Sequence, residues 1–425
     1  MWLLDTLTLE LEEYFGANIP RYAILSHTWE REEVSYHEMR GDHEAILHKA
    51  GFKKIQRFCE LSKSYGYLHA WVDTCCIDKR SSAELSEAIN SMYQWYCTAG
   101  ACIIYLSDVP FAPEQGQKIP NEYIRRLENS RWFTRGWTLQ ELIAPQTRLF
   151  FAADWSLIGE IARSRYRDHS MHDLLDLVSD ITNISVAVLR DNVDLNTRCV
   201  AERMSWAARR QTTRDEDVAY SLMGLFNVNM PILYGECARG AFMRLQNEII
   251  KTSFDQTIFA WCDDQDSSGL LAERPLAFLN TPPLAIWKVN MLAPFSMTNV
   301  GLSIRLPVYR TSLIDAVPNT VLVALQCEVK TDEGWRILLT RIQVFASLDC
   351  FLNGQRFQAC RRIDCSRWAV IPEASLLGCP YQNFVFLEDT HSDLILEATM
   401  SHKLRSVENK GELKQHAQWG GGRIN

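Results

Sequence analysis

The chain has 425 residues, of which 47% are hydrophobic and 23% are charged, a composition typical of a globular protein with two or three domains. Its formal net charge of −8 argues against broad electrostatic binding to nucleic acid or to an anionic membrane. The longest apolar runs are about six residues, whereas a membrane-spanning helix needs about 20. We therefore expect no nucleic-acid partner and no membrane span.

The amino terminus carries no secretory signal pattern, because Asp5 interrupts a short apolar stretch and acidic residues soon follow. The 13 cysteines show neither regular spacing nor a nearby histidine pair. We expect reduced thiols in a cytosolic or nuclear protein, with a cytoplasmic location as the working assignment, and no metal site.

Strand and helix patterns alternate through the first part of the chain. The alternation of Leu7, Leu9 and Leu11 with polar residues indicates a half-buried strand, a short helix being the alternative. Buried strands are predicted at residues 22–26, 67–73, 102–106 and 149–151, and helices at 51–65 and 81–96. Ser81 and Glu84 have the spacing of a capping box. Residues 1–155 thus predict an α/β domain with a mostly parallel sheet and helices on both faces.

The pattern changes twice after this domain. Hydrophobic spacing becomes helical, which predicts a helical extension at residues 156–262, with a second capping box at Thr213. Short apolar segments separated by Gly, Pro and Asn then predict an antiparallel, sandwich-like β domain at 270–400. The polar tail at 401–425 is expected to be disordered.

A basic cluster lies within the helical extension. Its members are Arg203, Arg209, Arg210 and Arg214, and three acidic residues follow at 215–217. We interpret the cluster as a solvated or salt-bridged face, with an anion site as the alternative.

Residues 130–145 combine two tryptophans, two arginines and one carboxylate. A short predicted helix between a glycine and a proline places Trp137 and Glu141 four residues apart, on one face. An aromatic ring beside a carboxylate suits a sugar or nucleotide site. A buried ion pair of Glu141 with Arg131 or Arg135 explains the same residues, and the pattern alone favours this structural interpretation.

Polar and aromatic residues also follow two predicted strands. His27, Thr28 and Trp29 come after one strand and Asp73 ends the next, where open α/β sheets bind their ligands. Polar turn residues are equally common at strand ends. The glycine motifs of dinucleotide and phosphate-loop sites are absent, as are the serine-hydrolase and zinc-peptidase motifs.

Four blocks in this order resemble the HET domain of fungal heterokaryon (vegetative) incompatibility proteins. They are residues 22–29 (YAILSHTW), 71–79 (WVDTCCIDK), 82–92 (SAELSEAINSM) and 130–145, and with later stretches the resemblance extends over residues 1–262. It implies a cytosolic effector whose activation kills the cell when genetically different hyphae fuse. Relatives often carry a nucleotide-binding and repeat region, which is missing here, so a separate sensor protein or the β domain would do the sensing.

The HET domain is in turn thought to be similar to TIR domains, which have a flavodoxin-like α/β fold. The TIR motif Ser-x-Trp-Cys-x-x-Glu-Leu falls at residues 135–142, although Thr138 replaces the cysteine and Gly136 the residue before tryptophan. In enzymatic TIR domains this glutamate cleaves the nicotinamide–ribose bond of NAD. The resemblance therefore implies that Glu141 is the candidate catalytic residue of an NAD glycohydrolase, with NAD as the substrate and no cofactor required.

The residues that the resemblance implies for an NAD-like nucleotide site are Ser26, His27, Thr28, Trp29, Trp71, Asp73 and Trp137, the tryptophans stacking on a ring. The alternative is a non-enzymatic adaptor that signals by self-association, in which Glu141 and Trp137 hold the fold or an interface. Homo-oligomerisation is compatible with both, since TIR-type enzymes commonly need it to complete their sites.

Overall fold

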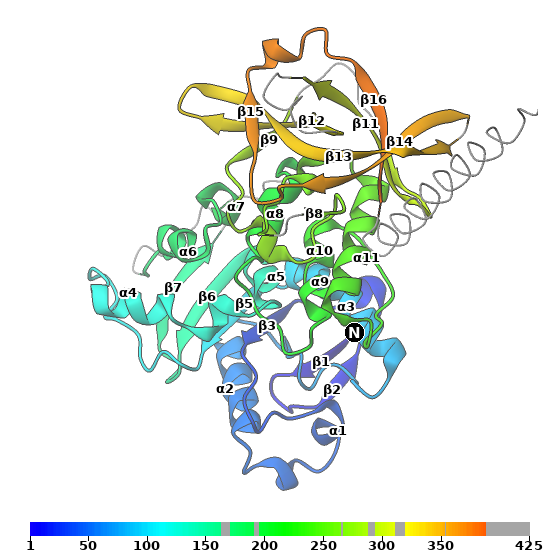
Figure 1. Ribbon diagram of the computed structural model, residues 1–425. Helices are drawn as coiled ribbons and strands as arrows, with labels where there is room; N and C mark the ends of the chain where they lie inside the picture. Colours follow the sequence, from blue (N-terminus) through cyan, green and yellow to red (C-terminus); the bar gives the residue numbers. More distant parts are fainter. Residues whose placement is uncertain are drawn as a thin grey trace, which may run out of the picture. The chain divides into compact units, whose positions relative to one another are not determined.

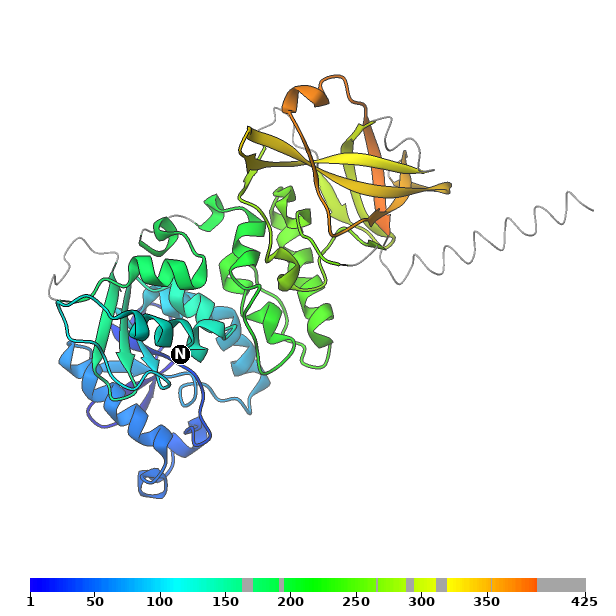
Figure 2. The same cartoon turned by 60° about the vertical axis from the view of Figure 1, so that its left-hand side comes forward.

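The computed structural model describes residues 1–162, 171–190, 195–264, 267–287, 294–310, 319–352 and 354–387. It divides into two compact units (Figures 1 and 2), residues 1–249 with 273–279 and residues 250–272 with 280–425. The first unit joins the expected α/β domain to most of the expected helical extension. The expected tail at 401–425 lies outside the described residues.

A mixed sheet is the centre of the first unit, with the strand order β2-β1-β4-β3-β5-β6-β7 within the described residues. The strands are β1 (Trp2–Asp5), β2 (Leu11–Glu13), β3 (Tyr22–His27), β4 (His69–Trp71), β5 (Ala101–Leu106), β6 (Thr147–Ala152) and β7 (Leu157–Ala162). The four strands β4-β3-β5-β6 are parallel, as expected. The outer strands are antiparallel additions that the pattern did not predict: β1 and β2 extend the sheet beyond β4, and β7 extends it beyond β6.

Helices cover both faces of this sheet. The longer ones are α2 (Ala50–Ser64), α3 (Ser82–Thr98), α4 (Asn121–Glu128), α6 (Leu175–Thr182) and α11 (Cys237–Thr252); the shorter ones are α1 (Tyr36–Met39), α5 (Thr138–Ile143), α7 (Val186–Arg190), α8 (Val200–Ser205), α9 (Asp217–Tyr220) and α10 (Met223–Phe226). The connection β3-α2-β4 runs one way along the sheet and β4-α3-β5 runs back. Right-handed connections therefore place α2 on one face and α3 with α5 on the other (Figures 1 and 2). Among the described residues, none of these helices is long and apolar enough to cross a membrane.

The predicted helices at 51–65 and 81–96 are confirmed as α2 and α3. At the start of α3 the Ser81 hydroxyl accepts the N–H of Glu84, as a helix cap does. The Glu84 carboxylate does not complete the predicted box, since it accepts the N–H of Asp78 at 2.8 Å. It thereby ties the helix to the loop that follows β4.

Three local predictions are wrong. Leu7 and Leu9 lie in a turn, not a strand, because the Asp5 carboxylate accepts the N–H groups of residues 7 and 8. Residues 157–162 form strand β7, not a helix; Ile158 and Ile161 are both buried, and their spacing of three residues resembles a helical period. The predicted box at residue 213 does not cap a helix, since α9 begins at residue 217 without a side-chain cap.

The second unit is a barrel-like sheet where a sandwich was expected. Its strands are β8 (Ser267–Ser268), β9 (Leu284–Ile286), β10 (Phe295–Met297), β11 (Gly301–Tyr309), β12 (Thr320–Thr331), β13 (Gly334–Leu352), β14 (Gln355–Ile363), β15 (Ala369–Ile371) and β16 (Tyr381–Leu387). Pairing of β11 with β12 closes the ring β11-β16-β14-β13-β12. The long strands β12 and β13 carry register shifts, which bend strands and favour closure. The β14–β16 pair is parallel, against the expected antiparallel pattern.

Arg362 is fully buried in the second unit. Its guanidinium lies 4.1 Å from the ring centre of Trp261 and 4.3 Å from that of Trp368. It also donates hydrogen bonds to three backbone carbonyl groups, and burial lowers the pKa of Arg362 to about 10. This side chain links residues 259–261 to the strand β14 on which it lies.

Candidate functional site

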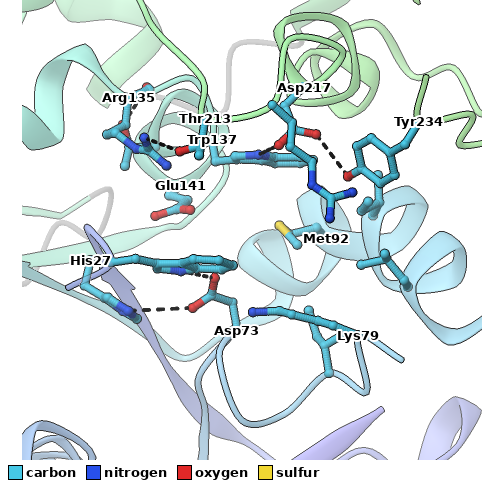
Figure 3. Close-up of a pocket in the computed structure, with 16 residues that line it drawn as sticks. His27, Asp73, Lys79, Met92, Arg135, Trp137, Glu141, Thr213, Asp217 and Tyr234 are labelled. Atoms are coloured by element: carbon cyan, nitrogen blue, oxygen red, sulfur yellow. Dashed lines mark hydrogen bonds and ion pairs between the residues drawn. The ribbon is translucent and has the colours of Figure 1, made fainter. Parts of the chain in front are cut away.

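A cavity of about 230 Å³ opens at the carboxyl ends of β3 and β4, and all its described lining residues belong to the first unit (Figure 3). The direction of the connections reverses beside β3, between β4 and β5. Open α/β sheets bind ligands at such a switch point. The lining comes from the loops after β3 and β4, from α3, from the start and middle of α5, from the turn at residues 213–216 with the start of α9, and from the turn at residue 234.

Glu141 lies in this cavity on α5 and is only 7% exposed. The Ser26 hydroxyl, near the end of β3, donates a hydrogen bond to its carboxylate. The same hydroxyl accepts the indole N–H of Trp132 at 2.7 Å. A hydrogen-bonded chain from Trp132 through Ser26 therefore fixes the direction of the Glu141 carboxyl group.

Burial raises the pKa of the Glu141 carboxyl to about 8, while the Ser26 hydrogen bond acts in the opposite direction. The negative charge of Asp73 adds to the rise. The positive charge of Arg210 acts to lower the pKa of Glu141, although the two side chains form no ion pair. The arginines near Glu141 in sequence are engaged elsewhere: Arg131 pairs with Glu30 and Asp108, and the Arg135 guanidinium donates to the Thr213 hydroxyl. The structural interpretation of Glu141 as half of an ion pair with one of these arginines is therefore wrong.

One wall of the cavity is built on Asp73, just after β4. The indole N–H of Trp29 donates to the Asp73 carboxylate at 2.7 Å, and Lys79 Nζ lies 3.8 Å from the centre of the Trp29 ring. His27 Nε2 lies 3.8 Å from the Asp73 carboxylate without a hydrogen bond (Figure 3). Burial lowers the pKa of His27 to about 3, so its ring is neutral at physiological pH.

The opposite wall repeats this arrangement around Asp217 of α9. The indole N–H of Trp137 and the hydroxyl of Tyr234 each donate to the Asp217 carboxylate at 3.0 Å (Figure 3). The guanidinium of Arg214 lies 4.0 Å from the centre of the Tyr234 ring. On both walls a carboxylate holds an indole in place and a cation covers an aromatic ring.

A short seam joins the two walls. The N–H of Gly136 donates to the carbonyl of Gln211 at 2.8 Å, and the N–H of Gln211 donates to the carbonyl of Thr134 at 2.7 Å. A Cβ atom on Gly136 would lie 2.5 Å from the methyl group of Thr212, so this close approach requires glycine. Arg210 adds hydrogen bonds to the Thr138 hydroxyl and to a carbonyl group just before α5. The seam docks residues 210–212, which precede α9, against the start of α5.

Most of the residues predicted for the site line the cavity: His27, Trp29, Asp73, Trp137 and Glu141. Ser26 lies directly behind the carboxylate that it contacts. Thr28 is buried outside the lining. Trp71 is also outside the lining, since it is fully buried with its ring against those of Trp95 and Tyr96. Its place in the core follows from its position inside β4, before the loop that reaches the cavity.

Other lining residues were not predicted for the site, and the polar ones among them are Lys79, Arg135, Thr138, Thr213, Arg214, Asp217 and Tyr234. Arg214 belongs to the basic cluster that was interpreted as a solvated face. Two other members of that cluster are tied into the fold, since Arg203 donates to the carbonyl of Leu225 and Arg210 to the seam. The basic cluster was visible in the sequence, but its linear spacing does not show which of its arginines reach the cavity and which are held within the fold.

Comparisons with known proteins match part of the chain. Residues 22–119 match the family model described as heterokaryon incompatibility protein (HET). The chain is 44% identical over 239 residues to the vegetative incompatibility protein HET-E-1 of Podospora anserina, an alignment that covers 56% of this chain. The chain spans 16% of the length of that relative. No solved structure matches the chain.

Proposed function

Because residues 22–119 form a HET domain, we propose that this chain is an effector of heterokaryon incompatibility that hydrolyses NAD at the nicotinamide–ribose bond, with Glu141 as the catalytic carboxylate. The likeness to a vegetative incompatibility protein supports the biological role, in which nonself recognition leads to programmed cell death. The parallel strand order β4-β3-β5-β6, which is that of flavodoxin-like sheets, supports a likeness to TIR domains.

One observation carries the proposed chemistry: a buried carboxyl group without an ion-pair partner among the described residues lies in a cavity that two indoles line. An opposite charge nearby favours the ionised form of a buried acid, and aromatic faces attract cations. The complementary ligand is therefore a flat ring with a positive charge. The nicotinamide ring of NAD has both properties.

The reaction follows from the fixed position of Glu141. The bond between the ribose C1′ atom and the ring nitrogen breaks, and its electron pair goes to the ring, which leaves as neutral nicotinamide without a general acid. Positive charge develops on the ribose, where an ionised carboxylate stabilises it. Water adds to C1′ and releases a proton, which leaves ADP-ribose. Ser26 and Trp132 act as positioning residues for Glu141, since they hold its carboxyl group through hydrogen bonds.

The cavity volume restricts what enters. Pockets that bury drug-sized molecules measure about 300–1,000 Å³. A volume of about 230 Å³ suits the nicotinamide ring with part of its ribose. The remainder of a dinucleotide would lie at the mouth, in contact with side chains of the rim.

The test is nicotinamide release from NAD by the purified full chain, at dilute and at crowded concentrations, because self-association is part of the proposal. Glu141→Gln removes the charge at nearly constant shape, and Glu128→Gln changes an exposed glutamate on α4 as the matched control. We expect release that Glu141→Gln abolishes and Glu128→Gln retains. No release under either condition, with a Glu141→Gln protein that still kills fungal cells, would instead establish the non-enzymatic adaptor.

A further inference from the structure

Three cationic side chains line the cavity, of which Arg135 is engaged with the Thr213 hydroxyl, while Lys79 and Arg214 lie one on each wall. Lys79 lies in the loop between β4 and α3, and Arg214 lies between α8 and α9. Both residues expose part of their surface to solvent, although partial burial of the Lys79 ammonium group lowers its pKa. Within the described residues neither forms an ion pair or a side-chain hydrogen bond, in contrast to the arginines of the seam and the core. Each is held only by the aromatic ring beneath it.

The acids around Lys79 are already engaged. Asp73 and Glu33 are the carboxylates whose negative charges act on it. Asp73 accepts the indole N–H of Trp29, and Glu33 pairs with Lys54 at 2.5 Å. The Lys79 ammonium group therefore keeps its hydrogen-bonding capacity for a group outside the wall.

The same holds for Arg214. The nearby carboxylates are Asp217, whose pKa burial raises, and Glu216, whose pKa a backbone hydrogen bond lowers; the positive charge of Arg214 acts on both. Asp217 accepts from Trp137 and Tyr234, and Glu216 accepts a backbone N–H at 2.7 Å. All five N–H groups of the Arg214 guanidinium thus lack an acceptor among the described residues.

We propose that Lys79 and Arg214 form a subsite for phosphoryl groups, so that the site takes a phosphorylated pyridine nucleotide in preference to the riboside or the free ring. The inference rests on the proposed function, which places the cationic ring beside Glu141. The small cavity leaves the phosphoryl groups at the rim, where the cations are. Arginine binds phosphoryl oxygens in a bidentate manner and lysine binds them as a point charge.

The experiment compares the binding of nicotinamide riboside and nicotinamide mononucleotide, which differ by one phosphoryl group. Affinities are measured by calorimetry on the full chain carrying Glu141→Gln, to prevent turnover. Lys79→Met and Arg214→Met remove each charge and keep an apolar side chain over the aromatic ring. Arg80→Met and Arg209→Met are the matched controls, because both are exposed neighbours outside the cavity lining.

We expect each rim substitution to weaken mononucleotide binding by about tenfold, since a hydrogen bond to a charged group contributes about that factor. The rim substitutions should not change the affinity for the riboside. The preference of the parent site for the mononucleotide should shrink as salt rises from about 0.05 to about 0.5 M, because salt screens the attraction between exposed charges. The two control substitutions should change neither affinity.

Two results would overturn the inference, and they differ in what they leave standing. Equal affinity for the two ligands, or a preference for the mononucleotide that survives both rim substitutions, rules out the subsite. NAD hydrolysis then still stands if the parent chain, which keeps Glu141, releases nicotinamide. Absence of binding by either ligand, together with absence of nicotinamide release from NAD by the parent chain that keeps Glu141, removes the subsite and the proposed function.

Discussion

Glu141→Gln should stabilise the fold above neutral pH, although it abolishes the proposed activity. On folding, the pKa of the Glu141 carboxyl rises from its ordinary value of 4.5 to about 8 because the group is buried. One pKa unit corresponds to about 1.4 kcal/mol. Holding an ionised Glu141 in the folded state therefore costs about 5 kcal/mol above pH 8, and keeping it protonated at pH 7 costs about 3 kcal/mol.

The sign follows from the proton balance. Between pH 4.5 and 8 the unfolded chain has lost the Glu141 proton that the folded chain keeps, so stability falls as the pH rises. Below pH 4.5 both states are protonated and this contribution vanishes. Glutamine has no charge to bury, and its carbonyl can accept the hydrogen bond from Ser26. An unpaired N–H group of the glutamine amide would lower the stability of the variant by about 1–3 kcal/mol at every pH. This penalty shifts the plot of stability against pH without changing its slope.

The assay is urea unfolding of the parent, Glu141→Gln and the surface control Glu128→Gln at intervals from pH 5 to pH 9. We expect the stability difference between Glu141→Gln and the parent to grow by about 4 kcal/mol over this range, and that of the control to stay flat. A difference that is constant, or that turns against Glu141→Gln as the pH rises, would show that the fold stabilises the ionised carboxylate, and it would refute the reasoning.

Three further predictions test other parts of the structure. Folding lowers the pKa of His27 from 6.5 to about 3, so protonation of the unfolded chain destabilises the parent at acid pH. His27→Gln should remove this effect, so that urea unfolding shows the variant gaining about 3 kcal/mol of stability over the parent between pH 7 and pH 4. An equal response of the two proteins to pH would contradict this. Ser26→Ala should raise the pKa of Glu141 further, which moves the acidic limb of the pH–rate profile to higher pH. It should also leave the Trp132 N–H unpaired, which lowers the free energy of unfolding by about 1–3 kcal/mol. An unmoved pH–rate profile would count against the hydrogen-bonded chain. Arg362→Met should destabilise the second unit by about 1–3 kcal/mol, because three buried carbonyl groups lose their donor, and it should spare nicotinamide release. Calorimetry beside the activity assay checks this, and loss of release on this substitution would contradict it.

Local pattern was a good guide wherever one element carried the whole signal. The apolar runs of β3 and β5 are buried on both faces of a parallel sheet, so each reads as a continuous hydrophobic segment. Trp137 and Glu141 share a face because four residues make about one helical turn. Both line the cavity for that reason.

Features that depend on distant packing could not be predicted in this way. Asp217 and Tyr234 reach the cavity because the chain after α8 docks against the start of α5, through contacts such as that of Arg210 with Arg135, which are 75 residues apart in the sequence. The barrel closure depends on register shifts in β12 and β13, which leave little trace in a hydrophobic pattern. In the edge strand β7 the buried residues Ile158 and Ile161 are three apart, a spacing that a hydrophobic pattern reads as helical.

The seam between Gly136 and Gln211 also sets an order of events during synthesis. Ribosomes release the chain from its amino terminus, so the sheet, Trp29 and Glu141 emerge well before Asp217 and the opposite wall. A nascent chain that ends before the seam forms lacks Arg214, Asp217 and Tyr234, which line one side of the cavity. The pocket comes into existence as a late step, and an interrupted translation product carries only half of it.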